Sequence, residues 1–272
     1  MDKIYNQQDI PVEELQKLGL LNNGKPMLSD ADMDALLAGH RTDLITFYDL
    51  HADGIHIKRM DAKLSLNSSE DGQITLQLHP IYRDVKKHPL LLDSEAEQLE
   101  NGKLTHVLKT YQDGVGKGKS WIIEYDPETK EFIAADTEKI KVPTLINGEK
   151  LTDIQKEQYR NGSVVELTDG TKLQRRASSR SGVTSNREAL MYSLVLDGGI
   201  SYMLLRSLRN LFGSKTQQKD PYTDGYQRAL YDMQQRDQNK TNINQSFTAE
   251  QLNDSNEVYK RQDRSLGKHN SR

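Results

Sequence analysis

The chain has 272 residues, of which 35% are hydrophobic and 28% charged, and its formal net charge at pH 7 is −3. This length allows one or two domains. The absence of cysteine excludes disulfide bonds, thiolate metal sites and a cysteine nucleophile. No run approaches the roughly 20 apolar residues of a membrane span, and the first residues lack the apolar stretch of a signal peptide. We therefore expect a cytoplasmic protein without membrane contact.

The charge is distributed unevenly along the chain. Residues 1–170 contain 20 Lys and Arg against 30 Asp and Glu, whereas residues 171–215 contain 8 against 2. Such an asymmetry has two interpretations. The basic segment binds an anionic partner, or it packs against the acidic body of the same chain.

The first 40 residues predict two short helices, at 11–19 and 29–39. The second begins at Ser29, a good N-cap residue, and ends at Gly39, which suits the left-handed position after a helix. Alternating aspartates in its first turn resemble a calcium loop, but Ala35 occupies the position where such a loop needs glycine. Helix capping explains the aspartates.

A run of alternating apolar and polar residues follows, which is typical of an antiparallel sheet with one wet face. Asp-Gly pairs at 53–54 and 71–72 mark turns. The expected strands are 44–50, 55–58, 62–66 and 74–78. We assign residues 8–85 to an N-terminal domain of helices and β-meander.

An internal repeat is the most informative pattern in the sequence. Residues 91–102 align with 151–162, and six of the twelve positions are identical. Each copy predicts a helix that ends at Asn-Gly. The N-cap candidates are Asp93 in the first copy and Thr152 or Asp153 in the second.

Strand-like residues follow each of these helices. We expect 103–111 to pair with 121–125, and 163–174 to pair with 190–196. Each unit is then a helix plus a β-hairpin, at 88–147 and 148–213, and the first unit continues through a further turn at 126–130. The fold class is α+β.

The end of the chain changes in character. Apolar residues at 200, 204, 208 and 211 share one face of a helix, so the spacing predicts an amphipathic helix over 200–212. Residues 214–272 contain nine Gln and six Asn with few apolar residues. Such a composition is typical of disorder, apart from one transient helical turn around Tyr226.

Two motifs that suggest chemistry fail on inspection. The stretch from Gly114 to Ser120 resembles a P-loop, but Asp113 stands where that motif requires glycine, and a strand rather than a helix follows. His51 and His56 flank a turn without a third ligand at a convincing spacing. The sequence identifies no catalytic residue, cofactor or metal site, although a spatial triad would not show in it.

The basic segment is the best candidate for a binding site. A Ser- and Gly-rich loop with arginines matches phosphate groups through charge and hydroxyl contacts. Few aromatic residues accompany it, which argues against a dedicated single-strand binder. The candidate nucleic-acid-binding residues are Lys172, Arg175, Arg176, Arg180, Arg187, Arg206, Arg209, Lys117 and Lys119.

Residues 35–44 and 151–162 resemble domain families of unknown function that occur in conjugative and other mobile-element proteins of Bacteroidetes. The resemblance covers roughly residues 10–205 and rests on helix caps and turns. It implies a helix–meander domain followed by copies of a "Leu-Thr-x-x-Gln, later Gly, then strand" module. It also implies proximity to type IA DNA topoisomerases, to which some relatives are fused or near which they are encoded.

Together these observations predict a non-enzymatic accessory protein of a mobile genetic element. It would bind DNA non-specifically, or assist a DNA-processing enzyme such as a topoisomerase. Two alternatives stay open: a protein–protein interaction module without nucleic-acid contact, and an enzyme of unrecognised chemistry. The oligomeric state is not determined by the sequence.

Overall fold

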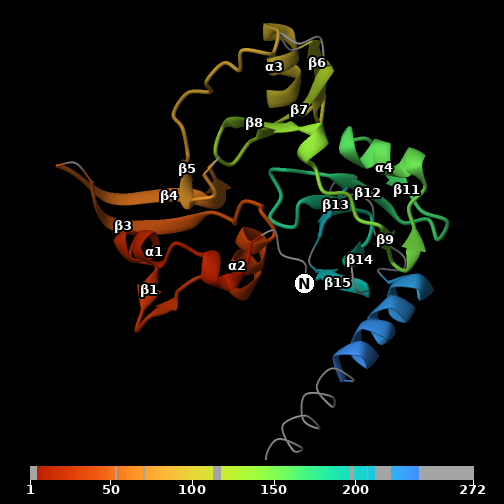
Figure 1. The fold of residues 1–272 in the computed structure, drawn as a ribbon. Coiled ribbons are helices and arrows are strands. Elements are labelled where there is room, and N and C mark those ends of the chain that lie inside the picture. The colour runs from red at the N-terminus through yellow and green to blue at the C-terminus, as the bar shows by residue number, and fades with distance from the viewer. Residues whose placement is uncertain are drawn as a thin grey trace, which may run out of the picture. The chain divides into compact units, whose positions relative to one another are not determined.

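The computed structural model describes residues 5–52, 54–69, 71–112, 118–196, 199–206, 208–211 and 222–238. The fold is mixed α/β with several antiparallel sheets (Figure 1). The chain forms two units, Met1–Tyr226 and Gln227–Arg272. Everything that follows on packing, pockets and sites concerns the first unit.

The N-terminal helices form where the sequence predicts them. A short 3-10 turn η1 (Gln7–Asp9) precedes α1 (Val12–Lys17), and a two-residue hairpin, β1 (Leu21–Asn22) and β2 (Lys25–Pro26), leads to α2 (Asp30–Leu37). The Ser29 hydroxyl accepts a hydrogen bond from the Asp32 backbone N–H at 3.1 Å, which satisfies one of the free donors at the start of α2.

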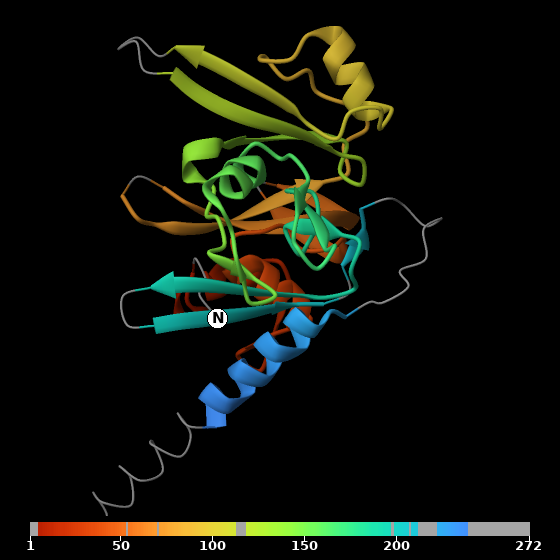
Figure 2. The ribbon, with the colours of Figure 1, turned by 90° about the vertical axis from the view of Figure 1, so that its right-hand side faces the viewer.

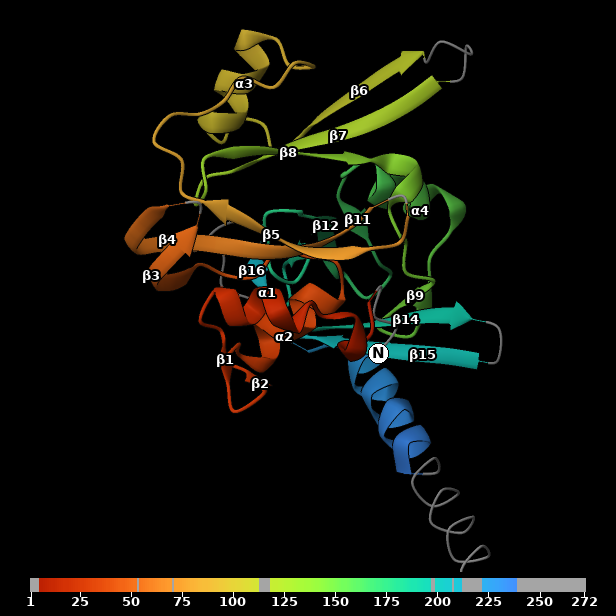
Figure 3. The ribbon, with the colours of Figure 1, turned by 60° about the vertical axis from the view of Figure 1, so that its left-hand side comes forward.

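The meander is a three-stranded antiparallel sheet of β3 (Ile45–Ala52), β4 (Ile55–Ser68) and β5 (Ile74–Pro80). The expected break between 55–58 and 62–66 is absent, because β4 is one continuous strand of 14 residues. Residues 62, 64 and 66 point to α1 and α2 and build a buried core with Leu15, Leu36 and Phe47. Figure 3 shows both helices on one side of this sheet and β8 on the other.

The first predicted module has the expected elements. Helix α3 (Asp93–Glu100) is followed by an antiparallel sheet of β6 (Val107–Gln112), β7 (Gly118–Asp126) and β8 (Glu131–Asp136). The N-cap of α3 is Leu92 rather than Asp93, since the Glu95 carboxylate accepts the Leu92 backbone N–H at 2.8 Å. Asp93 forms an ion pair with Lys87 instead.

The second helix, α4 (Asp153–Arg160), begins with a reciprocal cap between Thr152 and Gln155. Short strands surround it: β9 (Leu145–Ile146), β10 (Glu149–Lys150), β11 (Val165–Glu166), β12 (Lys172–Arg175) and β13 (Val183–Ser185). A 3-10 turn η2 (Thr137–Lys139) connects β8 to this part of the chain.

The strand pairing expected in the second module is wrong. Strand β12 pairs with β13, whereas β14 (Leu190–Leu196) pairs with β9 and with β15 (Gly199–Leu205). The helix expected over 200–212 is also absent, and its residues form β15 and β16 (Arg209–Asn210). The physical reason is that β15 pairs with β14 along its whole length, from Leu190 opposite Leu205 to Leu196 opposite Gly199, which requires an extended backbone (Figure 2). In the sequence, Asp-Gly at 197–198 is a hairpin signal that favours this pairing.

The polar tail is not irregular throughout. Residues 224–238 form a helix, so the expectation of a single transient turn is wrong for this stretch. The Thr223 hydroxyl accepts the Tyr226 backbone N–H at 3.2 Å, as an N-cap does. The remainder of the predicted disordered tail, together with residues 214–221, lies outside the described residues.

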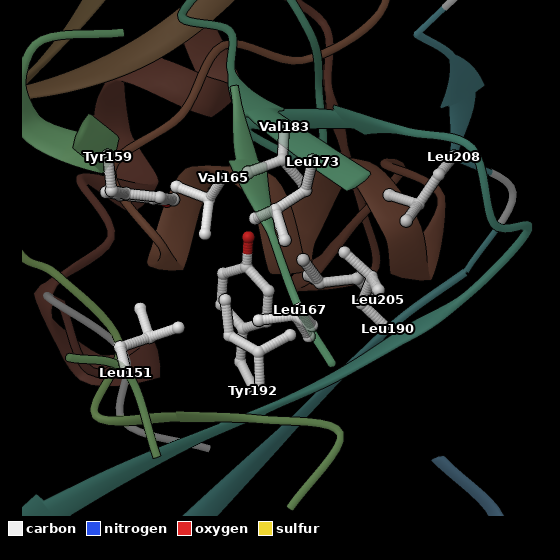
Figure 4. Close-up of a cluster of buried hydrophobic side chains, with 11 residues drawn as sticks. Leu151, Tyr159, Val165, Leu167, Leu173, Val183, Leu190, Tyr192, Leu205 and Leu208 are labelled. Atoms are coloured by element: carbon white, nitrogen blue, oxygen red, sulfur yellow. The ribbon is translucent and has the colours of Figure 1, made fainter. Parts of the chain in front are cut away.

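A second core unites the C-terminal half of the first unit. Figure 4 shows it as a cluster of aliphatic side chains around Tyr192, which points its hydroxyl into the cluster. Tyr159 of α4 and Leu205 of β15 belong to the same cluster. The boundaries 85/88 and 147/148 that we assign from the sequence stay predictions.

Candidate functional site

Four of the predicted nucleic-acid-binding cations form ion pairs inside the protein. Arg175 donates to the buried Glu124 carboxylate at 3.0 Å, and Arg180, whose side chain is 30% exposed, contacts the half-exposed Asp43 at 2.7 Å. The other two are more exposed. The pairs are Lys172–Glu166 at 3.1 Å, Arg175–Glu124, Arg180–Asp43 and Arg209–Glu128 at 3.2 Å.

Two further arginines of the basic segment bind backbone carbonyl oxygens. Arg176 donates to the Thr105 carbonyl at 2.5 Å, and Arg187 donates to the Asp169 carbonyl at 3.0 Å. The arginine loop is therefore joined to β-strands and turns on several sides. That these residues contact phosphate stays a prediction, and each would have to share donors that its internal contacts now use.

Of the remaining predicted cations, Lys117 lies outside the described residues, and Lys119 and Arg206 are on different elements. Lys119 is on β7, and Arg206 is exposed just after β15 beside a second hollow that Asp30 and Asp34 of α2 also line. The eight candidates that the structure describes are therefore not gathered into one surface.

A buried ionic network joins three segments of the first unit. Lys63, on the face of β4 away from α1 and α2, is 1% exposed, and its ammonium group contacts Asp126 at 2.9 Å and Glu128 at 2.7 Å. It also donates to the Ser178 carbonyl at 3.2 Å. One lysine thus ties the meander to the β7–β8 turn and to the arginine loop.

Neighbouring charges complete this network. Arg41 contacts Asp126 at 3.5 Å and Glu131 at 2.9 Å, and Arg209 contacts Glu128. Burial opposes ionisation of Glu128, but Lys63 and Arg209 outweigh it and lower the pKa of that carboxyl. Three cations face three carboxylates, the balance that a buried ion cluster requires.

The arginine loop closes over the end of α2 at Gly182. This residue has φ +70°, and any β-carbon there would collide with the His40 ring, so glycine is needed twice over. Burial lowers the pKa of His40 to about 4, with a smaller contribution from the nearby Arg175 charge. His40 is therefore neutral at pH 7 and donates to the Arg180 carbonyl.

A pocket of about 550 Å³ lies at the centre of the first unit. Its walls come from the end of α2, from β7 and β8, from the residues after β8, and from β14 and β15. Aromatic side chains line it: Trp121, Tyr159 and Tyr192. The volume falls in the range of small-molecule sites, which are typically apolar with a few polar groups.

The charge around the pocket is positive. Lys139, Lys141 and Arg175 line it against the single acid Asp136, whose carboxylate accepts the Glu138 backbone N–H at 2.9 Å. Lys139 and Lys141 are exposed at the rim, and within the described ranges neither has a carboxylate within 4 Å. Arg175 already forms an ion pair with the buried Glu124 carboxylate.

A buried pair of tyrosines lies in the pocket wall. Tyr192 is 5% exposed, and its hydroxyl faces the hydroxyl of Tyr159. Burial raises the pKa of Tyr192 well above 10, so the phenol is neutral. The pair therefore places neutral hydroxyl groups in the wall of the pocket.

Sequence reasoning did not find this pocket. Its residues come from positions as distant as His40 and Leu205, and no local motif joins them. The available signals were the lone Trp121 and the lysine pair after the β7–β8 hairpin. Across the described ranges, no group of three or more His, Asp or Glu is placed to hold a metal ion.

Comparison with known proteins covers only the N-terminal part of the chain. A family model described as "Protein of unknown function (DUF4099)" matches residues 5–90, which span α1 to β5 and the segment after it. No curated protein and no solved structure matches the chain. No helix in the described part of the chain is long and apolar enough to cross a membrane.

Proposed function

We propose that this protein is a non-enzymatic accessory factor that binds single-stranded DNA at the rim of the central pocket. The observation that carries the proposal is the meeting of Trp121 with Lys139 and Lys141 at one hollow. A positively charged groove with an aromatic side chain is how sequence-independent single-strand binders hold backbone and base.

The rim lysines suit phosphate better than the arginine loop does. They are exposed, and no carboxylate in the described ranges neutralises them. The arginines of the loop already donate hydrogen bonds to Glu124, Asp43 and backbone carbonyl oxygens. A phosphate that displaced those internal contacts would gain less than one that meets a solvated ammonium group.

A salt series tests this proposal directly. Fluorescence anisotropy of the full chain with single- and double-stranded DNA is measured between 50 and 200 mM salt. We expect K139A/K141A to reduce the slope of log affinity against log salt by about 1.4 for single strands, because two phosphate contacts are lost.

The double variant K25A/K58A is the matched control, because it removes two exposed lysines that lie away from the pocket. It should leave the slope unchanged. An identical slope for K139A/K141A and the unmodified chain would overturn the proposal, and so would a slope that only the arginine variants change.

The setting we propose is that of a mobile genetic element, where the protein would assist a DNA-processing enzyme such as a type IA topoisomerase. This part rests on the resemblance of residues 35–44 and 151–162 to mobile-element proteins. A stimulation assay would compare relaxation of supercoiled DNA by such an enzyme with and without the full chain. An unchanged rate would remove the topoisomerase from the proposal.

A second candidate function is protein docking, and the β3–β4 hairpin favours it. Tyr48 and Ile55 are 65% and 64% exposed there, beside the stacked rings of His51 and His56. If the hairpin docks a topoisomerase, Y48S/I55S should abolish co-sedimentation with the enzyme and leave DNA affinity unchanged. Retained co-sedimentation would eliminate this candidate.

A further inference from the structure

The central pocket extends inward beyond the lysine rim. Its interior is formed by Tyr159, Tyr192, Met203 and Leu205. These side chains are flat or apolar and belong to the second core or pack against it. An apolar interior below a cationic rim matches a ligand with a planar uncharged part and an attached anion.

The polar groups of the interior are few and specific. The Tyr192 hydroxyl is buried beside the hydroxyl of Tyr159, and both residues line the pocket. Asn67 and Ser181 also line the pocket. A hydroxyl and an amide both donate and accept, so they match the exocyclic groups of a nucleobase.

We infer that this pocket binds one unpaired nucleotide, with the base inside against Trp121 and Tyr192 and the phosphate on Lys139 and Lys141. The inference rests on the proposed function and adds to it the part of the DNA that enters the protein. A base paired within a duplex does not reach such an interior, which gives a physical reason for single-strand preference.

The chain provides its own probe for this site. Trp121 is its sole tryptophan and lines the pocket, so intrinsic fluorescence reports on that position. The full chain is titrated with a thymidine oligonucleotide, an abasic oligonucleotide of equal charge, thymidine monophosphate and inorganic phosphate. We expect quenching by the oligonucleotide and none by its abasic counterpart.

The titrations with thymidine monophosphate and with inorganic phosphate show whether the pocket needs a DNA strand, a free nucleotide or only a phosphate group. Quenching by thymidine monophosphate at similar concentration supports a site for a free nucleotide as well as for a strand. Quenching by inorganic phosphate alone, equal to that by the oligonucleotide, overturns the base-binding part of the inference.

Tyr192→Phe tests the interior without disturbing the fold. Among the described residues the hydroxyl meets only the neutral hydroxyl of Tyr159, so the variant should lower the melting temperature by no more than about 4 °C. Its affinity for the thymidine oligonucleotide should fall about 3- to 10-fold, and its affinity for the abasic one should not change. Tyr125→Phe, on β7 and outside the pocket, is the matched control.

The failures of the two proposals differ. Salt-dependent DNA binding that leaves Trp121 fluorescence and Tyr192→Phe unaffected overturns the nucleotide pocket and leaves the accessory function standing. Quenching by thymidine monophosphate without any oligonucleotide binding overturns the accessory function and supports the pocket.

Discussion

The arginine loop and the lysine rim carry the same charge and use it in opposite ways. Arg175 and Arg180 form ion pairs with Glu124 and Asp43. Lys139 and Lys141 lie a few residues beyond the β8 strand and stay in solvent. The number of cations in a segment therefore does not locate a binding surface, since what matters is whether each cation already has a partner.

The largest expected effect comes from removing the Asp126 carboxylate, which pairs with the buried Lys63. Asp126→Ala would leave Lys63 buried with one carboxylate partner fewer, which should lower the free energy of unfolding by about 3–5 kcal/mol. Chemical denaturation of the full chain measures the loss.

The double variant K63M/D126L is the control for this experiment, because it removes both charges and fills a similar volume. It should recover much of the lost stability, as apolar replacements of buried ion pairs often do. A loss below about 1 kcal/mol for Asp126→Ala would show that the pair does not hold the segments together.

The pH dependence of stability tests the same inward region at His40. The pKa of this residue is about 4 in the folded protein, against about 6.5 when unfolded. Between these values the unfolded chain binds a proton that the folded chain does not, so the free energy of unfolding should fall as pH decreases from 6.5 to 4. The decrease should reach about 3 kcal/mol at most.

His40→Gln keeps a donor for the Arg180 carbonyl and removes the titration. Its stability should change less over this pH window than that of the unmodified chain. Parallel curves for the two proteins would show that His40 is solvated.

Arg180 and the rim lysines allow a direct exchange of roles. Arg180→Ala should lower the free energy of unfolding by about 1–2 kcal/mol, because Asp43 loses a charged hydrogen-bond partner. It should leave the salt slope of DNA binding unchanged. K139A/K141A should reduce the salt slope of DNA binding and leave the free energy of unfolding unchanged. A reduced slope for Arg180→Ala, or an unchanged slope for K139A/K141A, would show that the arginine loop and not the lysine rim contacts DNA.

The sequence was sufficient for elements whose signals are local. Local signals lie within a few residues: Ser29, the Asn-Gly pairs at the ends of α3 and α4, and the alternation along β4. The three expected helices are present, and the two strands expected at 55–58 and 62–66 are parts of the single strand β4. The helix predicted over 200–212 is wrong, because these residues form β15, which pairs with β14, and β16. The sequence holds a signal for this pairing, since Asp-Gly at 197–198 is typical of a hairpin.

The candidate site was beyond sequence reasoning for a different reason. Arg180 finds its partner 137 positions earlier at Asp43, and Lys63 finds Ser178 at a separation of 115 residues. Such pairings depend on how whole segments pack. Four of the eight cations at 171–215 pair with carboxylates of the acidic body, which reduces the excess of cations over acids from six to two.

The smallest expected effect comes from removing the Ser29 cap at the start of α2. Ser29 caps this helix through the Asp32 backbone N–H, and its own hydroxyl also donates to the Asp32 carboxylate at 2.6 Å. That carboxylate lies 3.7 Å from Arg180. Ser29→Ala should lower the free energy of unfolding by about 1 kcal/mol, or about 2–4 °C in melting temperature.

The cap variant also reports on whether α2 and the arginine loop behave as one part. In the double variant S29A/R180A, the loss in the free energy of unfolding should be smaller than the sum of the losses in the two single variants. The reason is that Ser29 and Arg180 both contact Asp32. Strict additivity would mean that Asp43 alone holds Arg180. The loop would then be joined to the strand entrance at Asp43 and not to the helix.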